Sequence, residues 1–234
     1  MPSTLVSTLA GAPAEPVSIE GDHDVRVSGV LLTPPRARAC YVLAHGAGAG
    51  MKHRFMAAVA AELWQRDVAT LRYQFPYMER GAKRPDPPQL AQATVRAAVA
   101  AAARALPKLP LIAGGKSFGG RMTSQAQARE PLPGARGLAF LGFPLHPAGK
   151  PSRDRARHLD GVRIPMLFLQ GTRDTLAELG ELEAVCKALG DRATLKLFAD
   201  ADHSFHVPAR TGRTDAQIRG DLCDALASWI DGVI

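Results

Sequence analysis

Short apolar runs alternate with longer helix-like stretches through most of this chain, and this alternation restricts the fold more than any other feature. The apolar runs are closed by turn residues: CYVLAHG (40–46), VATLRYQFP (68–76), PLIAGGKS (110–117), GLAFLGFP (137–144), PMLFLQGTRD (165–174) and ATLKLFAD (193–200). The helix-like stretches between them cover residues 54–65, 89–106, 120–129, 177–189 and 216–230. Continuous apolar runs are typical of strands buried on both faces. The order therefore predicts an α/β fold, with a mostly parallel sheet and helices on both of its faces.

The N-terminal part of the chain has a different pattern. Residues 17–34, VSIEGDHDVRVSGVLLTP, predict two antiparallel strands joined by a turn at Gly21–Asp24. The chain has 234 residues, within the range that α/β folds use as one domain, so we expect a single domain over residues 1–234.

Composition and charge exclude several classes of partner. No apolar run approaches the roughly 20 residues that a membrane span needs, and residues 1–22 lack the basic start and apolar stretch of a secretory signal. We therefore expect a cytoplasmic protein with no membrane partner. The net charge of +7 is spread over scattered basic residues, and the loose concentrations at 79–84 and 150–158 are interleaved with acids, which argues against a nucleic-acid partner.

The segment GGKSFGG (114–120) has two incompatible interpretations, a phosphate-binding loop or a sharp turn that presents a serine. A phosphate loop of the form G-x-x-x-x-G-K-[ST] needs its first glycine at the position of Pro110, which has no N–H and begins the apolar strand. The same residues fit G-x-S-x-G, in which the serine sits on a strained turn between a strand and a helix. The flanking glycines suit that turn because a Cβ there would clash with neighbouring strands. We therefore prefer the serine turn and expect no tight binding of ATP or GTP.

A serine nucleophile on this kind of sheet needs an acid and a histidine, in that chain order, each at a strand end. Asp174 closes one apolar run, and His203 follows the last one, so Ser117, Asp174 and His203 are the predicted catalytic residues. His206 is the alternative base, although the place just after the strand favours His203. His146 precedes Asp174 in the chain, so as the base it would break the expected order of serine, acid and histidine. Asp200, Asp202, His203 and His206 resemble a metal cluster but lack a recognisable zinc spacing, so we expect no metal and no cofactor.

The tetrahedral oxyanion of such a reaction needs two N–H donors. The amide of Phe118 follows the serine directly, and the glycine-rich AHGAGAG (44–50) follows a buried strand, with Ala47 as the predicted second donor. The polar segments 77–88 and 145–161 also follow strands, so we expect them to overhang the site, although they are too short for a large lid. Gly46, Tyr77, Phe143 and His146 are the predicted substrate contacts.

With these motifs the chain resembles the α/β-hydrolase superfamily along nearly its whole length, and is most similar to its small lidless members related to dienelactone hydrolases. Those use a cysteine nucleophile, and Ser117 in this chain favours an ordinary serine esterase. RYQFPYMERGAKRPDPP (72–88) and GGKSFGGRM (114–122) resemble the branch that contains testis-expressed hydrolase-like proteins and the hydrolase-like domain of a histone-acetyltransferase complex subunit. Some members of that branch serve as interaction domains.

The cations Lys116 and Arg121 within this motif have two interpretations. Either could stabilise the oxyanion or hold an acidic substrate group. The interpretation that we favour is pairing with an acid such as Glu79 or Asp86, which would hold the segment 77–88 in place.

The sequence predicts a serine hydrolase, specifically a carboxylesterase that cleaves small or medium acyl esters through an acyl-enzyme on Ser117. Its partner would be a small-molecule ester. The alternative is a catalytically idle hydrolase fold that contacts a protein partner.

Overall fold

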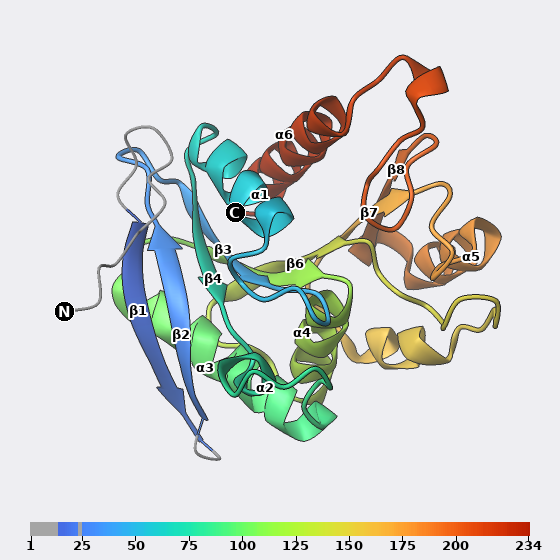
Figure 1. Ribbon diagram of the computed structural model, residues 1–234. Helices are drawn as coiled ribbons and strands as arrows, with labels where there is room; N and C mark the ends of the chain where they lie inside the picture. The colour runs from blue at the N-terminus through green and yellow to red at the C-terminus, as the bar shows by residue number, and fades with distance from the viewer. Residues whose placement is uncertain (1–13, 23–24) are drawn as a thin grey trace.

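The computed structural model describes residues 14–22 and 25–234, and in it one sheet is covered by helices on both faces (Figure 1). The strands are β1 (Ala14–Gly21), β2 (Val25–Leu32), β3 (Ala39–Ala44), β4 (Val68–Tyr73), β5 (Leu111–Lys116), β6 (Ala135–Leu141), β7 (Met166–Gly171) and β8 (Ala193–Phe198). The α-helices are α1 (Arg54–Trp64), α2 (Pro76–Glu79), α3 (Pro88–Ala105), α4 (Phe118–Arg129), α5 (Leu179–Leu189) and α6 (Asp215–Val233). Short 3-10 helices are η1 (Asp154–Gly161), η2 (Gly190–Arg192) and η3 (Ala209–Thr211).

The sheet is antiparallel at one edge and parallel in the rest. Its order is β1-β2-β4-β3-β5-β6-β7-β8. β2 pairs antiparallel with both β1 and β4, and every later pairing is parallel. The predicted mostly parallel sheet and the antiparallel strand pair before it are both confirmed. The predicted turn between β1 and β2 includes residues 23–24, which lie outside the described residues.

Alternate side chains of the central strands supply two separate cores. On β3, Tyr41 and Leu43 pack with α1 and α6, whereas Val42 and Ala44 pack with α3, α4 and α5 on the other face. All the side chains of β3, β4 and β7 are buried, as expected for strands covered on both faces. The edge strand β8 alternates between exposed and half-buried positions instead.

Two segments that the sequence predicts as loops contain short helical turns. The segment 77–88 begins inside α2, and η1 occupies the end of the segment 145–161. Neither is long enough for the periodic apolar pattern by which a helix is recognised in sequence. No lid domain is built from either segment.

The three cysteines lie in different layers and have free thiols. Cys40 is in β3, Cys186 in α5 and Cys223 in α6, and all three are buried. Burial is the main cause that raises the pKa of each thiol to about 12. Among the described helices, none combines the length and apolar character needed to cross a bilayer.

Candidate active site

Ser117 occupies the sharp turn between β5 and α4. Its backbone φ of 50° and ψ of −114° place it in a region that residues with a Cβ rarely adopt. Its N–H donates to the backbone oxygen of Leu141 at the end of the neighbouring β6, at 3.2 Å. Strained backbone of this kind persists only where the surrounding structure fixes it, and it is concentrated at functional sites.

The glycines on either side of Ser117 allow this turn to form. A Cβ on Gly115 would lie 2.3 Å from the backbone oxygen of Ala44, and one on Gly119 would lie 2.6 Å from that of His45. Both distances are shorter than any real contact of a Cβ. Because the obstructing atoms are backbone, they cannot move aside as a side chain could. Glycine is therefore required at Gly115, where β5 pairs with β3, and at Gly119, where the start of α4 passes close to the end of β3.

Ser117, His203 and Asp174 form a continuous chain of hydrogen bonds. His203 Nε2 lies 2.8 Å from Ser117 Oγ, and His203 Nδ1 lies 2.6 Å from Asp174 Oδ2. The three residues follow β5, β8 and β7, whose parallel arrangement brings their carboxyl ends to one edge of the sheet. The Asp174 side chain is 0% exposed and that of His203 is 23% exposed, so the acid is shielded while the imidazole reaches solvent.

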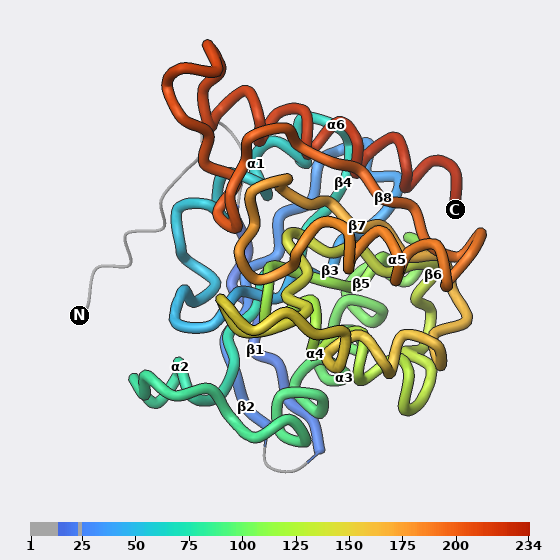
Figure 2. Tube along the Cα trace, turned by 90° about the vertical axis from the view of Figure 1, so that its right-hand side faces the viewer, coloured from blue at the N-terminus to red at the C-terminus, as the bar shows by residue number. Residues whose placement is uncertain are grey.

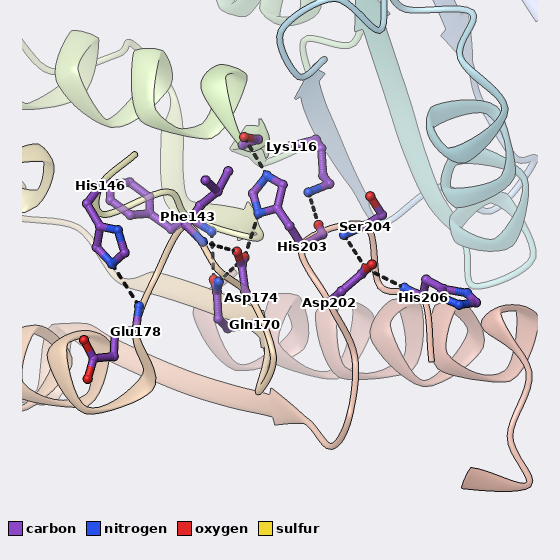
Figure 3. A network of polar contacts seen from close by, with 12 residues as sticks. Lys116, Phe143, His146, Gln170, Asp174, Glu178, Asp202, His203, Ser204 and His206 are labelled. Carbon is purple, nitrogen blue, oxygen red and sulfur yellow. Dashed lines mark hydrogen bonds and ion pairs between the residues drawn. The ribbon is translucent and has the colours of Figure 1, made fainter. Parts of the chain in front are cut away.

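The sequence prediction missed Gln170, which helps to hold Asp174. Gln170 Nε2 donates to Asp174 Oδ2 at 2.5 Å (Figure 3), and the backbone N–H of Leu176 donates to Oδ1 at 2.8 Å. Gln170 Oε1 in turn accepts from the N–H of Phe143 at 2.8 Å. The signal in the sequence is a single polar residue inside the apolar run MLFLQG, which a buried strand retains only when it is hydrogen-bonded.

His45, which the sequence prediction also missed, shapes the loop that carries Ala47. Its Nδ1 donates to the backbone oxygen of Gly46 at 2.7 Å, and its Nε2 accepts from the N–H of Phe75 at 3.2 Å. Burial lowers the pKa of this imidazole, which agrees with a neutral ring that donates at one nitrogen and accepts at the other. The phenol oxygen of Tyr77 accepts from the N–H of Gly48 at 2.9 Å and fixes the same loop from another side.

The two predicted oxyanion donors keep their N–H groups available. Among the described residues, neither the amide of Ala47 nor that of Phe118 donates to a backbone or side-chain acceptor. Phe118 begins α4, where the first N–H groups of a helix have no partner within it. The adjacent helix start also carries a partial positive charge. Both amides can therefore receive a ligand oxygen.

A cavity of about 840 Å³ opens beside Ser117. It is lined by the loop after β3, the start of α1, the loop after β8 and the start of α6, together with Ser117 and His203. Figure 2 shows the chain after β8 passing beside α1. The rings of Phe55, in α1, and Phe205, after β8, are stacked there with centroids 5.9 Å apart. The lining residues are Gly46, Ala47, Ala49, His53, Arg54, Phe55, Met56, Ala58, Lys116, Ser117, Leu176, His203, Ser204, Phe205, His206, Asp215 and Arg219.

Three of the four predicted substrate contacts lie elsewhere. Only Gly46 lines the cavity, and the expectation that the segments 77–88 and 145–161 overhang it is wrong, because none of their residues is among its lining. Tyr77 and Phe143 are fully buried, and the Phe143 ring packs against Phe168 at 5.7 Å. His146 is also buried, and its Nε2 accepts from the N–H of Glu178 at 3.1 Å. These side chains support loops instead of facing a ligand.

The favoured pairing of Lys116 or Arg121 with Glu79 or Asp86 is wrong. Asp86 accepts from Arg80 at 2.7 Å and from the N–H of Tyr77 at 2.8 Å, so another arginine fixes that segment. Glu79 accepts from the N–H of Ser28. Lys116 contacts the loop after β8, and Arg121 has a buried Nε that no described residue accepts from.

The acids and histidine near His203 have separate partners. His206 Nδ1 lies 2.9 Å from Asp215 Oδ2, and this bond raises the pKa of the imidazole. Asp202 accepts from two backbone N–H groups of its own loop. Asp200 lies 3.8 Å from Arg210. Within residues 14–22 and 25–234, no group of three or more His, Cys, Asp or Glu side chains is placed to hold a metal ion.

Solved structures with the same fold include several hydrolases. A dienelactone hydrolase from Anabaena variabilis superposes with a TM-score of 0.75 at 18% identity, covering 95% of this chain and 99% of that one. A serine hydrolase without a lid from Xanthomonas campestris gives a TM-score of 0.71 at 20% identity, covering 92% and 94%. The esterase Est22 gives 0.74 at 14% identity, covering 94% and 79%.

At such low identity these likenesses show the fold alone, which confirms the expected α/β-hydrolase architecture. The narrower resemblance to the testis-expressed and acetyltransferase-complex branch stays a prediction. Residues 37–231 match the family described as an alpha/beta hydrolase domain. With this match over most of its length, and with the fold and the serine turn described above, the chain belongs to the alpha/beta hydrolase family.

Proposed function

We propose that this protein is a serine hydrolase, specifically a carboxylesterase that cleaves small or medium acyl esters through an acyl-enzyme on Ser117. The observation that supports this most directly is the hydrogen-bonded chain from Ser117 through His203 to Asp174, in which Ser117 and His203 line the cavity and the nearby amides of Ala47 and Phe118 are available. Each group has the place that acyl transfer requires of it.

The reaction follows from these contacts. His203 Nε2 takes the proton of Ser117 Oγ as the oxygen attacks the ester carbonyl, and Nδ1–H remains bonded to Asp174, whose charge stabilises the imidazolium. The amides of Ala47 and Phe118 bind the oxyanion, each worth about 3–4 kcal/mol of transition-state stabilisation. His203 then protonates the leaving alcohol. A water molecule, deprotonated by the same nitrogen, releases the acid and restores Ser117.

The size of the cavity and its aromatic wall support a small or medium ester. The half-buried ring of Phe55, which stacks on the buried Phe205, offers apolar surface to the cavity. About 840 Å³ lies within the range of pockets that enclose small organic ligands.

A fluorophosphonate probe tests this proposal, because it reacts only with an activated serine. The native protein should label at one site, and the label should be lost in Ser117→Ala and strongly reduced in His203→Ala. Ser124→Ala is the matched control, because Ser124, in the helix that follows Ser117, also contacts a histidine, His158. It should label like the native protein.

Turnover should follow the same pattern with a series of 4-nitrophenyl esters from acetate to decanoate. Ser117→Ala should lower kcat by about 10⁵-fold or more. A folded native protein that neither labels nor hydrolyses any ester would instead favour the idle interaction domain.

A further inference from the structure

One cation of the site has no part in the reaction proposed above. Lys116 directly precedes Ser117, and its side chain lines the cavity. Burial lowers the pKa of its ammonium group to about 8, while Asp174 and Asp202 oppose this shift. A lysine is costly to bury unless its charge has partners, so the partners of Lys116 indicate what it does.

The ammonium of Lys116 contacts the segment 202–206, which we call the His203 loop, at two points. Nζ donates a hydrogen bond to the backbone oxygen of His203 (Figure 3). It also lies 5.5 Å from the centre of the Phe205 ring, within the range of a cation–π contact. Both contacts are made to the loop that carries the proposed general base.

The other contacts of the His203 loop shape it without joining it to β5. Asp202 Oδ1 accepts from the N–H groups of Ser204 and His206 at 2.7 and 2.9 Å, which closes a tight turn (Figure 3). Phe205 is buried with a strained φ of 63° and packs on Phe55 and Phe198. These interactions fix the loop to itself, to α1 and to β8, while the bonds of His203 to Asp174 and of His206 to Asp215 join it to the chain after β7 and to α6.

Lys116 supplies the connection to the serine. It is covalently adjacent to Ser117, and its hydrogen bond ends on the backbone of His203, whose ring lies 2.8 Å from Ser117 Oγ. Gly142 leaves room for this arrangement, since a Cβ there would lie 3.0 Å from Lys116 Nζ and 3.4 Å from the His203 ring. A shift of the loop away from β5 would stretch the lysine bond and the serine–histidine bond together.

We propose that Lys116 is a positioning residue that ties the His203 loop to β5 and so sets the distance between the base and the nucleophile. The inference rests on the proposed function, because it assigns Lys116 a part in the same reaction. A different role for the same cation would be to bind an acidic group of the substrate, and the experiment separates the two.

The experiment compares Lys116→Met and Lys116→Gln, which remove the charge, with Lys116→Arg, which retains it. Lys52→Met is the matched control, because Lys52 is exposed, precedes His53 of the cavity lining, and its loss changes the net charge equally. For each folded variant the fluorophosphonate labelling rate is measured, together with kcat and KM for a neutral 4-nitrophenyl ester and for one that carries a carboxylate.

Loss of the tie should lower the labelling rate and kcat by about tenfold to a hundredfold for both esters, since misplacing a base by an ångström has effects of this size. KM should change by less than about threefold, because uniform binding is unaffected. Lys116→Arg should recover part of the loss, and Lys52→Met should resemble the native protein. A loss confined to the carboxylate ester would overturn the proposal in favour of substrate binding, as would a normal labelling rate in Lys116→Met.

A measurement that needs no turnover keeps this test separate from that of the proposed function. Amide hydrogen exchange across residues 202–206 should become faster in Lys116→Met and Lys116→Gln, while exchange in the central strands stays unchanged. Unchanged exchange in the loop would overturn the tie. A native protein that fails to label would overturn the proposed function, whereas the exchange result would still decide whether Lys116 holds the loop.

Discussion

Two serines, Ser117 just before α4 and Ser124 within it, each contact a histidine, and the difference between the two pairs shows what a nucleophile needs besides a histidine. Ser117 Oγ lies 2.8 Å from His203 Nε2, and Ser124 Oγ lies 2.7 Å from His158 Nε2. Ser124, however, is buried inside α4, and its hydroxyl donates to the backbone oxygen of Arg121 at 3.0 Å. The Ser124 oxygen is then left to accept from His158. The Ser–His distance alone therefore does not identify a nucleophile.

The surroundings of the two histidines differ in charge. His203 bonds to the Asp174 carboxylate, which favours the imidazolium that a general base must become. Burial and the nearby Arg121 guanidinium lower the pKa of His158 to about 4, which disfavours the same cation. No carboxylate among the described residues bonds to His158. We therefore expect the second pair to contribute to packing alone.

The largest effect on this comparison should come from Asp174→Asn. The new amide would donate to His203 Nδ1 and force the imidazole into the tautomer that carries its proton at Nε2, where it can no longer accept from Ser117. The kcat for a 4-nitrophenyl ester should fall by about 10⁴-fold. Asp221→Asn, at an exposed acid paired with Arg213, controls for the change in charge. Near-native activity in Asp174→Asn would show that the carboxylate on His203 is not what distinguishes the Ser117–His203 pair from the Ser124–His158 pair.

A smaller effect is expected from Gln170→Leu, which removes one of the three donors to Asp174 and leaves those from His203 and the Leu176 N–H. A hydrogen bond to a charged group is worth about 1.5–3 kcal/mol, so kcat should fall by about tenfold to a hundredfold. Gln127→Leu is the matched control, because this buried glutamine also accepts from a backbone N–H, that of Leu132, but on the far part of α4. Both variants should lower the melting temperature. Only Gln170→Leu should lower kcat.

The smallest expected effect is on the free energy of unfolding at acid pH, and it comes from His158 of the second pair. The unfolded chain binds a proton at His158 near pH 6.5, whereas the folded protein binds it only near pH 4. The unfolded state therefore holds more protons between these values, and the free energy of unfolding falls as the pH drops through this window. His158→Gln removes this contribution. Urea titrations on either side of the window should show the variant losing about 1–3 kcal/mol less than the native protein. If the native protein and His158→Gln lost the same stability between these pH values, the lowered pKa of His158 would be contradicted.

The sheet and the serine turn could be predicted because each rests on local pattern. Uninterrupted apolar runs fit strands buried on both faces, and the close approach at Gly115 and Gly119 permits no other residue. Ser117, Asp174 and His203 could be placed together because parallel strands end at one edge of the sheet.

The supporting contacts could not be predicted, because they join distant backbone atoms. Lys116 bonds to a carbonyl oxygen, which every residue possesses, so no residue type in the sequence marks its partner. Phe143 and His146 do follow a strand, as the topology requires, but local packing turns their side chains inward. Knowing where a strand ends does not give the direction of the side chains that follow it.

The reactivity of the three buried thiols can report the local unfolding of the protein. With the pKa of each near 12, almost none of the reactive thiolate exists in the folded state at neutral pH. Alkylation therefore requires that the layer around a given cysteine first separates. Because Cys40 lies in the central sheet, Cys186 in one helix layer and Cys223 in the other, the order in which they react would record the order in which the protein comes apart.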